Sequence, residues 1–164
     1  MSAAIQNGLA HSQIWDFAGI DGLHFAKTIV GSAAAKISPF QSLESTIHNH
    51  PCSLLRLCTR NFRLRIYGFE DLTSYKSDLQ IWVKQCDWMS AIAVSDQFPI
   101  AQIALAKPPH RLTGLALNYA APAQIDGISV LIWRHALWGQ PVFEIHTATS
   151  DLETIQAKIR TWKD

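Results

Sequence analysis

The segment at residues 128–162, ISVLIWRHALWGQPVFEIHTATSDLETIQAKIRTW, decides the fold class expected from this sequence. Its first part has the pattern of two strands, at residues 128–134 and 142–146, joined by a turn at residues 138–140. Residues 150–153, SDLE, then have the spacing of a capping box at the start of a helix. An apolar stripe at steps of three and four residues continues that helix: Leu152, Ile155, Ile159 and Trp162. We therefore expect a sheet followed by a closing helix.

The sequence before this segment predicts helices first and strands afterwards. An apolar face at helical spacing indicates a helix over residues 23–37, and Pro51 is compatible with the first turn of a second helix over residues 53–60. Alternation of apolar and polar residues then indicates a strand at residues 62–66. Further strands are expected at residues 88–94 and 99–105, as a β-hairpin, and at residues 115–119. This order predicts a single α+β domain over residues 1–164, an antiparallel meander with N-terminal helices and a C-terminal helix.

Composition and charge exclude several classes of protein. The 164 residues include 14 Lys and Arg and 13 Asp and Glu, a formal net charge of +1, with 48% apolar and 16% charged residues. This mixture is too apolar for a disordered tail and has no basic excess of the kind that binds nucleic acid. No apolar run reaches the length of a membrane span, and the first ten residues contain no Lys or Arg, unlike a signal peptide. We therefore expect a cytoplasmic protein, most simply a bacterial one, without nucleic-acid or membrane partners.

The cysteines and histidines suggest neither a disulfide framework nor a standard metal site. Three cysteines at irregular spacing, Cys52, Cys58 and Cys86, indicate reduced thiols. A zinc site at His48, His50, Cys52 and Cys58 is an alternative, because imidazole and thiolate are good zinc ligands. The spacing of these residues matches no standard zinc pattern, so no metal is expected. No cofactor is expected either, since the sequence contains no phosphate loop and no dinucleotide-binding glycine pattern.

Two turns and an upstream segment resemble a known family. The residues that carry the resemblance are Asp96, Pro99 and Pro108 around one turn, Arg134 and Gly139-Gln140-Pro141 around another, and Ser53-Leu54-Leu55-Arg56-Leu57 upstream. This succession resembles the bacterial chorismate pyruvate-lyase family and its relatives, the UTRA ligand-binding domains, over residues 53–148. The resemblance implies an antiparallel sheet flanked by helices, with a small-molecule pocket enclosed between them.

The residues that perform the chemistry of that family are altered in this chain. The resemblance places the two arginines of the family at Met89 and Ala104, and its glutamate at His146. Met and Ala cannot form the two-pronged contact that arginine makes with a carboxylate. A shift of register by two residues would place Glu144 at the glutamate position, on the same face of the strand. The resemblance therefore implies ligand binding with altered or lost catalysis, or a chorismate-type elimination if the protein is an enzyme.

The candidate ligand-binding residues lie in the last hairpin. We expect Arg134 to hold an anionic group of a small aromatic or carboxylate ligand, and Glu144 and His146 to bond a polar edge of it. Trp133, or Trp138, would supply an apolar wall. The alternative is a non-catalytic interaction or assembly factor, in which exposed aromatic residues and the C-terminal helix contact a protein partner or a second copy. The sequence identifies no catalytic residue.

Overall fold

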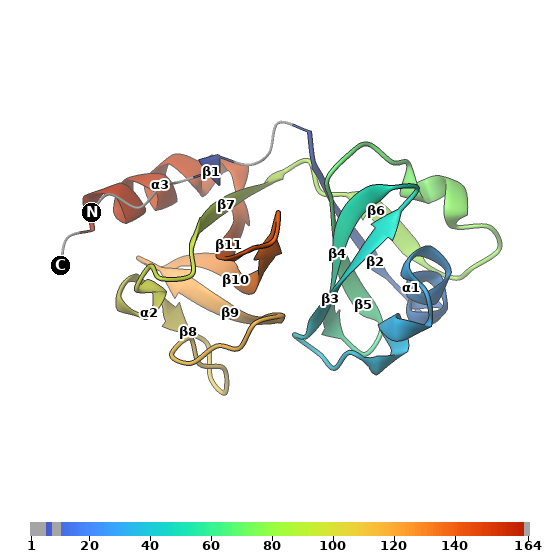
Figure 1. Cartoon of the computed structure of the whole chain (residues 1–164), viewed down its shortest axis with the longest axis horizontal. Coiled ribbons are helices and arrows are strands. Elements are labelled where there is room, and N and C mark those ends of the chain that lie inside the picture. The colour runs from blue at the N-terminus through green and yellow to red at the C-terminus, as the bar shows by residue number, and fades with distance from the viewer. Residues whose placement is uncertain (1–5, 8–10, 163–164) are drawn as a thin grey trace. The chain divides into compact units, whose positions relative to one another are not determined.

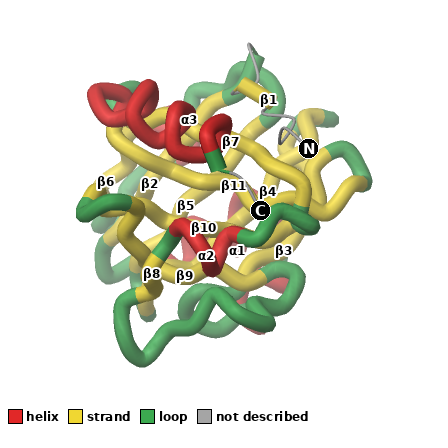
Figure 2. The backbone as a smooth tube through the Cα atoms, turned by 90° about the vertical axis from the view of Figure 1, so that its left-hand side faces the viewer, coloured by secondary structure: helices red, strands yellow, loops and turns green. Residues whose placement is uncertain are grey.

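The computed structural model of the chain describes residues 6–7 and 11–162. The described residues form two compact units. We call residues 11–87 the N-terminal unit, and residues 88–162 together with residues 6–7 the C-terminal unit. Each unit is built on one antiparallel sheet with helices packed on it (Figure 1), and the strands are yellow in Figure 2. The α+β class is confirmed, with two antiparallel sheets in place of one meander.

The N-terminal unit is a five-stranded sheet in the order β3-β4-β5-β2-β6. Its elements are β2 (Gln13–Ala18), α1 (Gly22–Val30), η1 (Ser32–Lys36), β3 (Ser42–Ile47), β4 (His50–Cys58), β5 (Asn61–Ile66), η2 (Leu72–Tyr75) and β6 (Trp82–Gln85). Aromatic rings fill its core: the centroid of the Phe17 ring lies 5.3 Å from that of Phe62 and 4.8 Å from that of Phe25. The helix expected over residues 23–37 ends early, because Gly31 adopts a φ of +94°, a conformation that favours glycine.

The C-terminal unit is a sheet in the order β1-β7-β11-β10-β9-β8. Its elements are β1 (Gln6–Asn7), β7 (Met89–Ser95), α2 (Ile100–Ile103), β8 (Leu105–Ala106), β9 (Tyr119–Ile125), β10 (Ile128–Leu137), β11 (Gln140–Ala148), η3 (Thr149–Asp151) and α3 (Leu152–Thr161). Ile155 and Ile159 of α3 are buried in one apolar core with Ile132 and Ile145 of the sheet. The apolar stripe of the last helix therefore packs on the unit's own sheet (Figure 1).

The helix expected over residues 53–60 is wrong, since these residues lie in β4 and in the turn that follows it. Ser53, Leu54 and Leu55 are all fully buried, although successive residues of a strand point to opposite faces. A strand buried on both faces reads as a continuous apolar run, which sequence periodicity does not distinguish from a short helix.

The hairpin expected between residues 88–94 and 99–105 is also wrong. The first strand exists as β7, but Pro99 is followed by the short helix α2. The next strand, β8, pairs with β9 and not with β7. The strand expected at residues 115–119 is a turn region, and β9 begins at its last residue, Tyr119.

Several other expectations are confirmed. Residues 62–66, 128–134 and 142–146 lie in the strands β5, β10 and β11, and the closing helix is α3. The capping box expected at residues 150–153 is not formed. The 3-10 turn η3 precedes α3, and the N-cap residue of α3 is Asp151, whose side chain makes no capping hydrogen bond. None of the helices in the described residues is long and apolar enough to cross a membrane.

Candidate functional site

Alternation along β10 and β11 sends neighbouring side chains to opposite faces of the C-terminal sheet. Ile132, Phe143 and Ile145 lie on the face that packs with α3 in the apolar core. Trp133 and Glu144 are directly opposite each other in the register of the two strands, on the other face. That second face also carries His135 and His146, each two residues further along its strand.

These four residues, Trp133, His135, Glu144 and His146, form a buried group that we call the polar cluster. The Glu144 carboxylate lies between the two imidazoles: its Oε1 is 2.5 Å from Nε2 of His146, and its Oε2 is 3.2 Å from Nε2 of His135. All four side chains are buried, with exposed fractions of 2% or less. Each oxygen of the Glu144 carboxyl group therefore lies within hydrogen-bond distance of one imidazole nitrogen, and the tautomer of each ring sets which atom is the donor.

The Trp133 indole fixes the position of both histidine rings. Its centroid lies 4.1 Å from that of His135 in a stacked arrangement and 5.9 Å from that of His146 edge-on. Ring packing as well as hydrogen bonding therefore holds the side chains of the polar cluster in place. Such a group can hold a proton between its carboxyl and imidazole groups, and it offers a carboxyl group and a flat aromatic ring as contacts for a ligand.

Arg134, the remaining candidate, lies on the opposite face. Its Nη2 is 2.7 Å from Oδ2 of Asp96, and its Nη1 donates to the backbone carbonyl of Leu115 at 2.9 Å. Arg134 of β10 therefore contacts both the segment that follows β7 and the segment that precedes β9. The structure brings Trp133, Glu144 and His146 together, and places Arg134 away from them. Trp138 lies in the β10–β11 turn with 61% of its surface exposed.

His135 is the member of the cluster that the sequence analysis missed. It follows Trp133 by two residues on one strand, so period-two alternation could have placed both side chains on the same face. The same rule separates Trp133 from its neighbour Arg134.

The residues of the alternative zinc site do not come together. Cys52 is buried in the core of the N-terminal unit, where desolvation and then the charge of Glu44 raise the pKa of its thiol to about 12. Cys58 is exposed at the other end of β4 from His50. His48 instead contacts Glu70, with 3.2 Å between Nδ1 and Oε1. Among the described residues, no three His, Cys, Asp or Glu side chains are placed to hold a metal ion.

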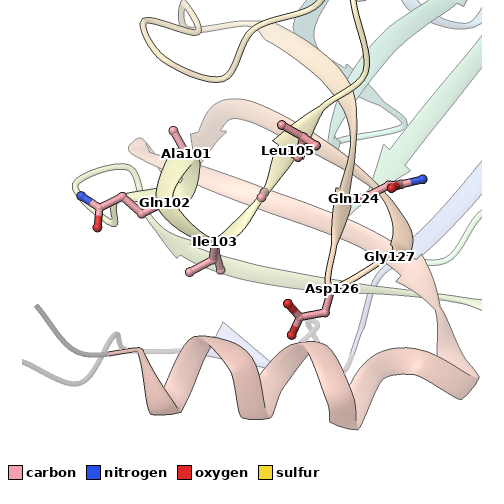
Figure 3. A pocket seen from close by; sticks show the side chains of 8 residues that line it. Ala101, Gln102, Ile103, Leu105, Gln124, Asp126 and Gly127 are labelled. Atoms are coloured by element: carbon pink, nitrogen blue, oxygen red, sulfur yellow. The ribbon is translucent and has the colours of Figure 1, made fainter.

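A surface pocket of about 400 Å³ lies elsewhere in the C-terminal unit (Figure 3). It is lined by α2, β8 and the β9–β10 turn: Ala101, Gln102, Ile103, Ala104, Leu105, Gln124, Asp126 and Gly127. Its carboxylate, Asp126, is paired with Lys158 of α3, with 3.2 Å between Oδ1 and Nζ. No residue of the polar cluster lines this pocket, and its side chains include no acid–base group apart from the paired Asp126.

The sequence matches no established family profile. It also matches no curated protein. Solved structures do match its fold. Aminomethyltransferase T of the glycine cleavage system from Bartonella henselae has a TM-score of 0.76 and 17% identity, over 96% of this chain and 45% of that one. Heterotetrameric sarcosine oxidase from Corynebacterium sp. U-96, in complex with pyrrole 2-carboxylate, has a TM-score of 0.66 and 17% identity, over 96% of this chain and 81% of that one.

These matches correct the family resemblance drawn from the turns. The fold is that of aminomethyltransferase and sarcosine oxidase chains, so the chorismate pyruvate-lyase and UTRA assignment is wrong. The expected function, binding of a small ligand by a chorismate lyase-like protein, and the lyase activity implied by it are withdrawn with that assignment. Short turn motifs recur in many antiparallel folds, and here the residues after Asp96 lead into a helix and not a hairpin. The chain spans less than half the length of the aminomethyltransferase that it matches.

Proposed function

We propose that this chain is an aminomethyltransferase-like protein that binds a reduced folate and takes part in the transfer of one-carbon groups from amino nitrogens. The observation that carries the proposal is the fold match over 96% of the chain to both an aminomethyltransferase and a sarcosine oxidase. The names of both enzymes describe chemistry at a carbon attached to an amino nitrogen, since sarcosine is N-methylglycine. A reduced folate is a carrier whose own nitrogens accept such one-carbon groups.

The polar cluster supports the proposed class of ligand. A pterin ring is flat and aromatic, and one edge of it presents neighbouring N–H donors of the guanidine type. A carboxylate is the matching acceptor for such an edge, and an indole is a suitable surface for stacking. Glu144 and Trp133 lie side by side on one face of the sheet, with His146 bonded to the same carboxylate. We therefore propose Trp133, Glu144 and His146 as the residues that contact the pterin.

We further propose that the chain works with a second polypeptide. The sarcosine oxidase is a heterotetramer, and 81% of its matched chain is covered. A protein partner is the arrangement consistent with that heterotetramer. Cytoplasmic placement belongs to the same proposal and is supported by the free thiols Cys52, Cys58 and Cys86.

The test is isothermal titration of the full chain with 5-formyltetrahydrofolate, a chemically stable reduced folate. We expect one binding site per chain. When the free folate concentration is a hundred times its Kd, binding should raise the free energy of unfolding by about 2.7 kcal/mol. Glu144→Gln replaces the carboxylate by an amide that is a poorer acceptor for two N–H donors. We expect it to weaken binding by about tenfold or more.

Lys158→Gln is the matched control, because it removes a charge from α3 without touching the polar cluster. We expect it to bind the folate as the unmodified chain does. Absence of binding to the unmodified chain, with circular dichroism confirming its fold, would refute the proposal. Equal affinity of Glu144→Gln and the unmodified chain would refute the placement of the pterin on the polar cluster.

A further inference from the structure

Strand β6 forms an open edge of the sheet in the N-terminal unit. In the described residues it pairs with β2 and is the last strand of the sheet. Trp82, Lys84 and Gln85 of this strand are exposed, and 54% of the Trp82 surface is in contact with solvent. An edge strand keeps outward backbone N–H and C=O groups that can pair with another strand.

The side chains of β6 alternate between two environments. Val83 packs against the apolar core of the unit, together with Phe17, its partner in β2. Trp82 and Lys84 flank Val83 in the strand, so both lie on the opposite face, next to each other. The strand therefore presents an indole and an ammonium group on one exposed face, separated by one residue.

This arrangement is complementary to itself. When two copies of the sequence Trp82-Val83-Lys84 run antiparallel with Val83 opposite Val83, each Trp82 lies directly opposite the Lys84 of the other copy. Two cation–π contacts then form across the two-fold axis, and no like charges meet. A lysine in an edge strand normally discourages pairing, but in this register it is placed over an aromatic ring.

We propose that β6 is a self-association surface, at which a second copy of this chain pairs antiparallel through Trp82, Val83 and Lys84. The two sheets would then form one continuous sheet across a two-fold axis, as in isologous dimers. The other described edges fit less well. β1 and β8 have two residues each, and a two-fold pairing of β3 about Glu44 would set like charges opposite each other. This inference is independent of the proposed function.

The association is expected to be weak, because a four-residue strand buries far less surface than a standard interface. We expect a Kd of about 100 µM, so that the dimer forms in the upper part of a concentration series from about 5 µM to about 1 mM. Sedimentation velocity on the full chain over that series measures the self-association directly.

The decisive variants exchange the two side chains. Trp82→Lys places lysine opposite Lys84, and we expect it to weaken association by about tenfold or more. The double variant Trp82→Lys with Lys84→Trp restores an indole opposite an ammonium group, and we expect it to associate as the unmodified chain does. Trp88→Lys is the control, since Trp88 is equally exposed, at 52%, and belongs to the C-terminal unit. We expect it to leave the association unchanged.

Circular dichroism checks that each variant is folded. Lys84→Glu is a second single variant, which removes the cation and should also weaken association if Trp82→Lys fails to fold. A chain that stays monomeric up to about 1 mM would overturn the proposal. So would a dimer that the single variants leave intact, or a double variant that remains as weak as Trp82→Lys, since either result would place the contact elsewhere.

Discussion

Replacement of Glu144 is the most informative perturbation of the C-terminal unit. Its side chain is about 1% exposed and forms hydrogen bonds with His135 and His146. In Glu144→Ala both imidazoles lose this hydrogen-bond partner inside the protein. A buried polar group left without a partner costs about 1–3 kcal/mol, and this change leaves two such imidazoles. We therefore expect the unfolding free energy to fall by about 3–5 kcal/mol.

Glu144→Gln separates the charge from the hydrogen bonds. The amide oxygen can still accept from one imidazole, while the amide nitrogen can donate to the other once that ring changes tautomer. We expect a loss of about 1–3 kcal/mol, clearly smaller than for alanine. Equilibrium urea unfolding, followed by far-ultraviolet circular dichroism, gives the free energy of unfolding for each variant.

Glu153→Ala is the control, because Glu153 is an exposed glutamate on α3, and a surface change of this kind stays within about 0.5 kcal/mol. A loss below about 1 kcal/mol for Glu144→Ala would refute the reasoning, since it would mean that the imidazoles do not depend on the carboxylate. Equal losses for alanine and glutamine would show that side-chain volume, and not hydrogen bonding, determines the effect.

Three further predictions concern the thiols and one glycine. A thiol reagent at pH 8 should modify only Cys58 rapidly in the native chain, because burial raises the pKa of Cys52 and of Cys86 to about 12; rapid reaction of all three would contradict this. Between about pH 9 and pH 12 the unfolded thiols lose protons that the native thiols keep, so stability should fall as pH rises. When both buried cysteines are replaced by alanine, the fall in stability that their thiols cause over this pH range should disappear. An unchanged dependence of stability on pH would refute the raised pKa of these thiols. Gly22→Ala should destabilise by several kcal/mol in urea unfolding, because an added Cβ would lie 2.3 Å from the carbonyl oxygen of Arg60; an effect below about 1 kcal/mol would contradict that contact.

Local patterns predicted the elements whose two faces differ. Alternation of apolar and polar residues at 62–66 identified β5, although all five are buried, and the stripe on α3 was recognised because only one side of that helix is buried. β4 was missed because Leu54 and Leu55, although adjacent, are both buried. The division into two sheets depends on pairings between distant segments, such as β2 with β5, that no local pattern records.

The candidate site was predictable in part for the same reason. Glu144 and His146 were expected on one face from their spacing of two residues, and the structure places them there in contact. Arg134 was grouped with Trp133 although adjacent residues of a strand point to opposite faces. The partner that holds Arg134, Asp96, is 38 residues away in the sequence, so no local signal identified it.

The proposed function places a reduced folate on the face of the C-terminal sheet that carries Trp133, Glu144 and His146. The most direct test is an NMR titration of the ¹⁵N-labelled chain with 5-formyltetrahydrofolate, in which indole and amide signals are assigned. We predict saturable shifts that are largest for the Trp133 indole N–H and for the amides of β10 and β11. Unchanged spectra at millimolar ligand, or shifts confined to residues outside these two strands, would contradict the claim.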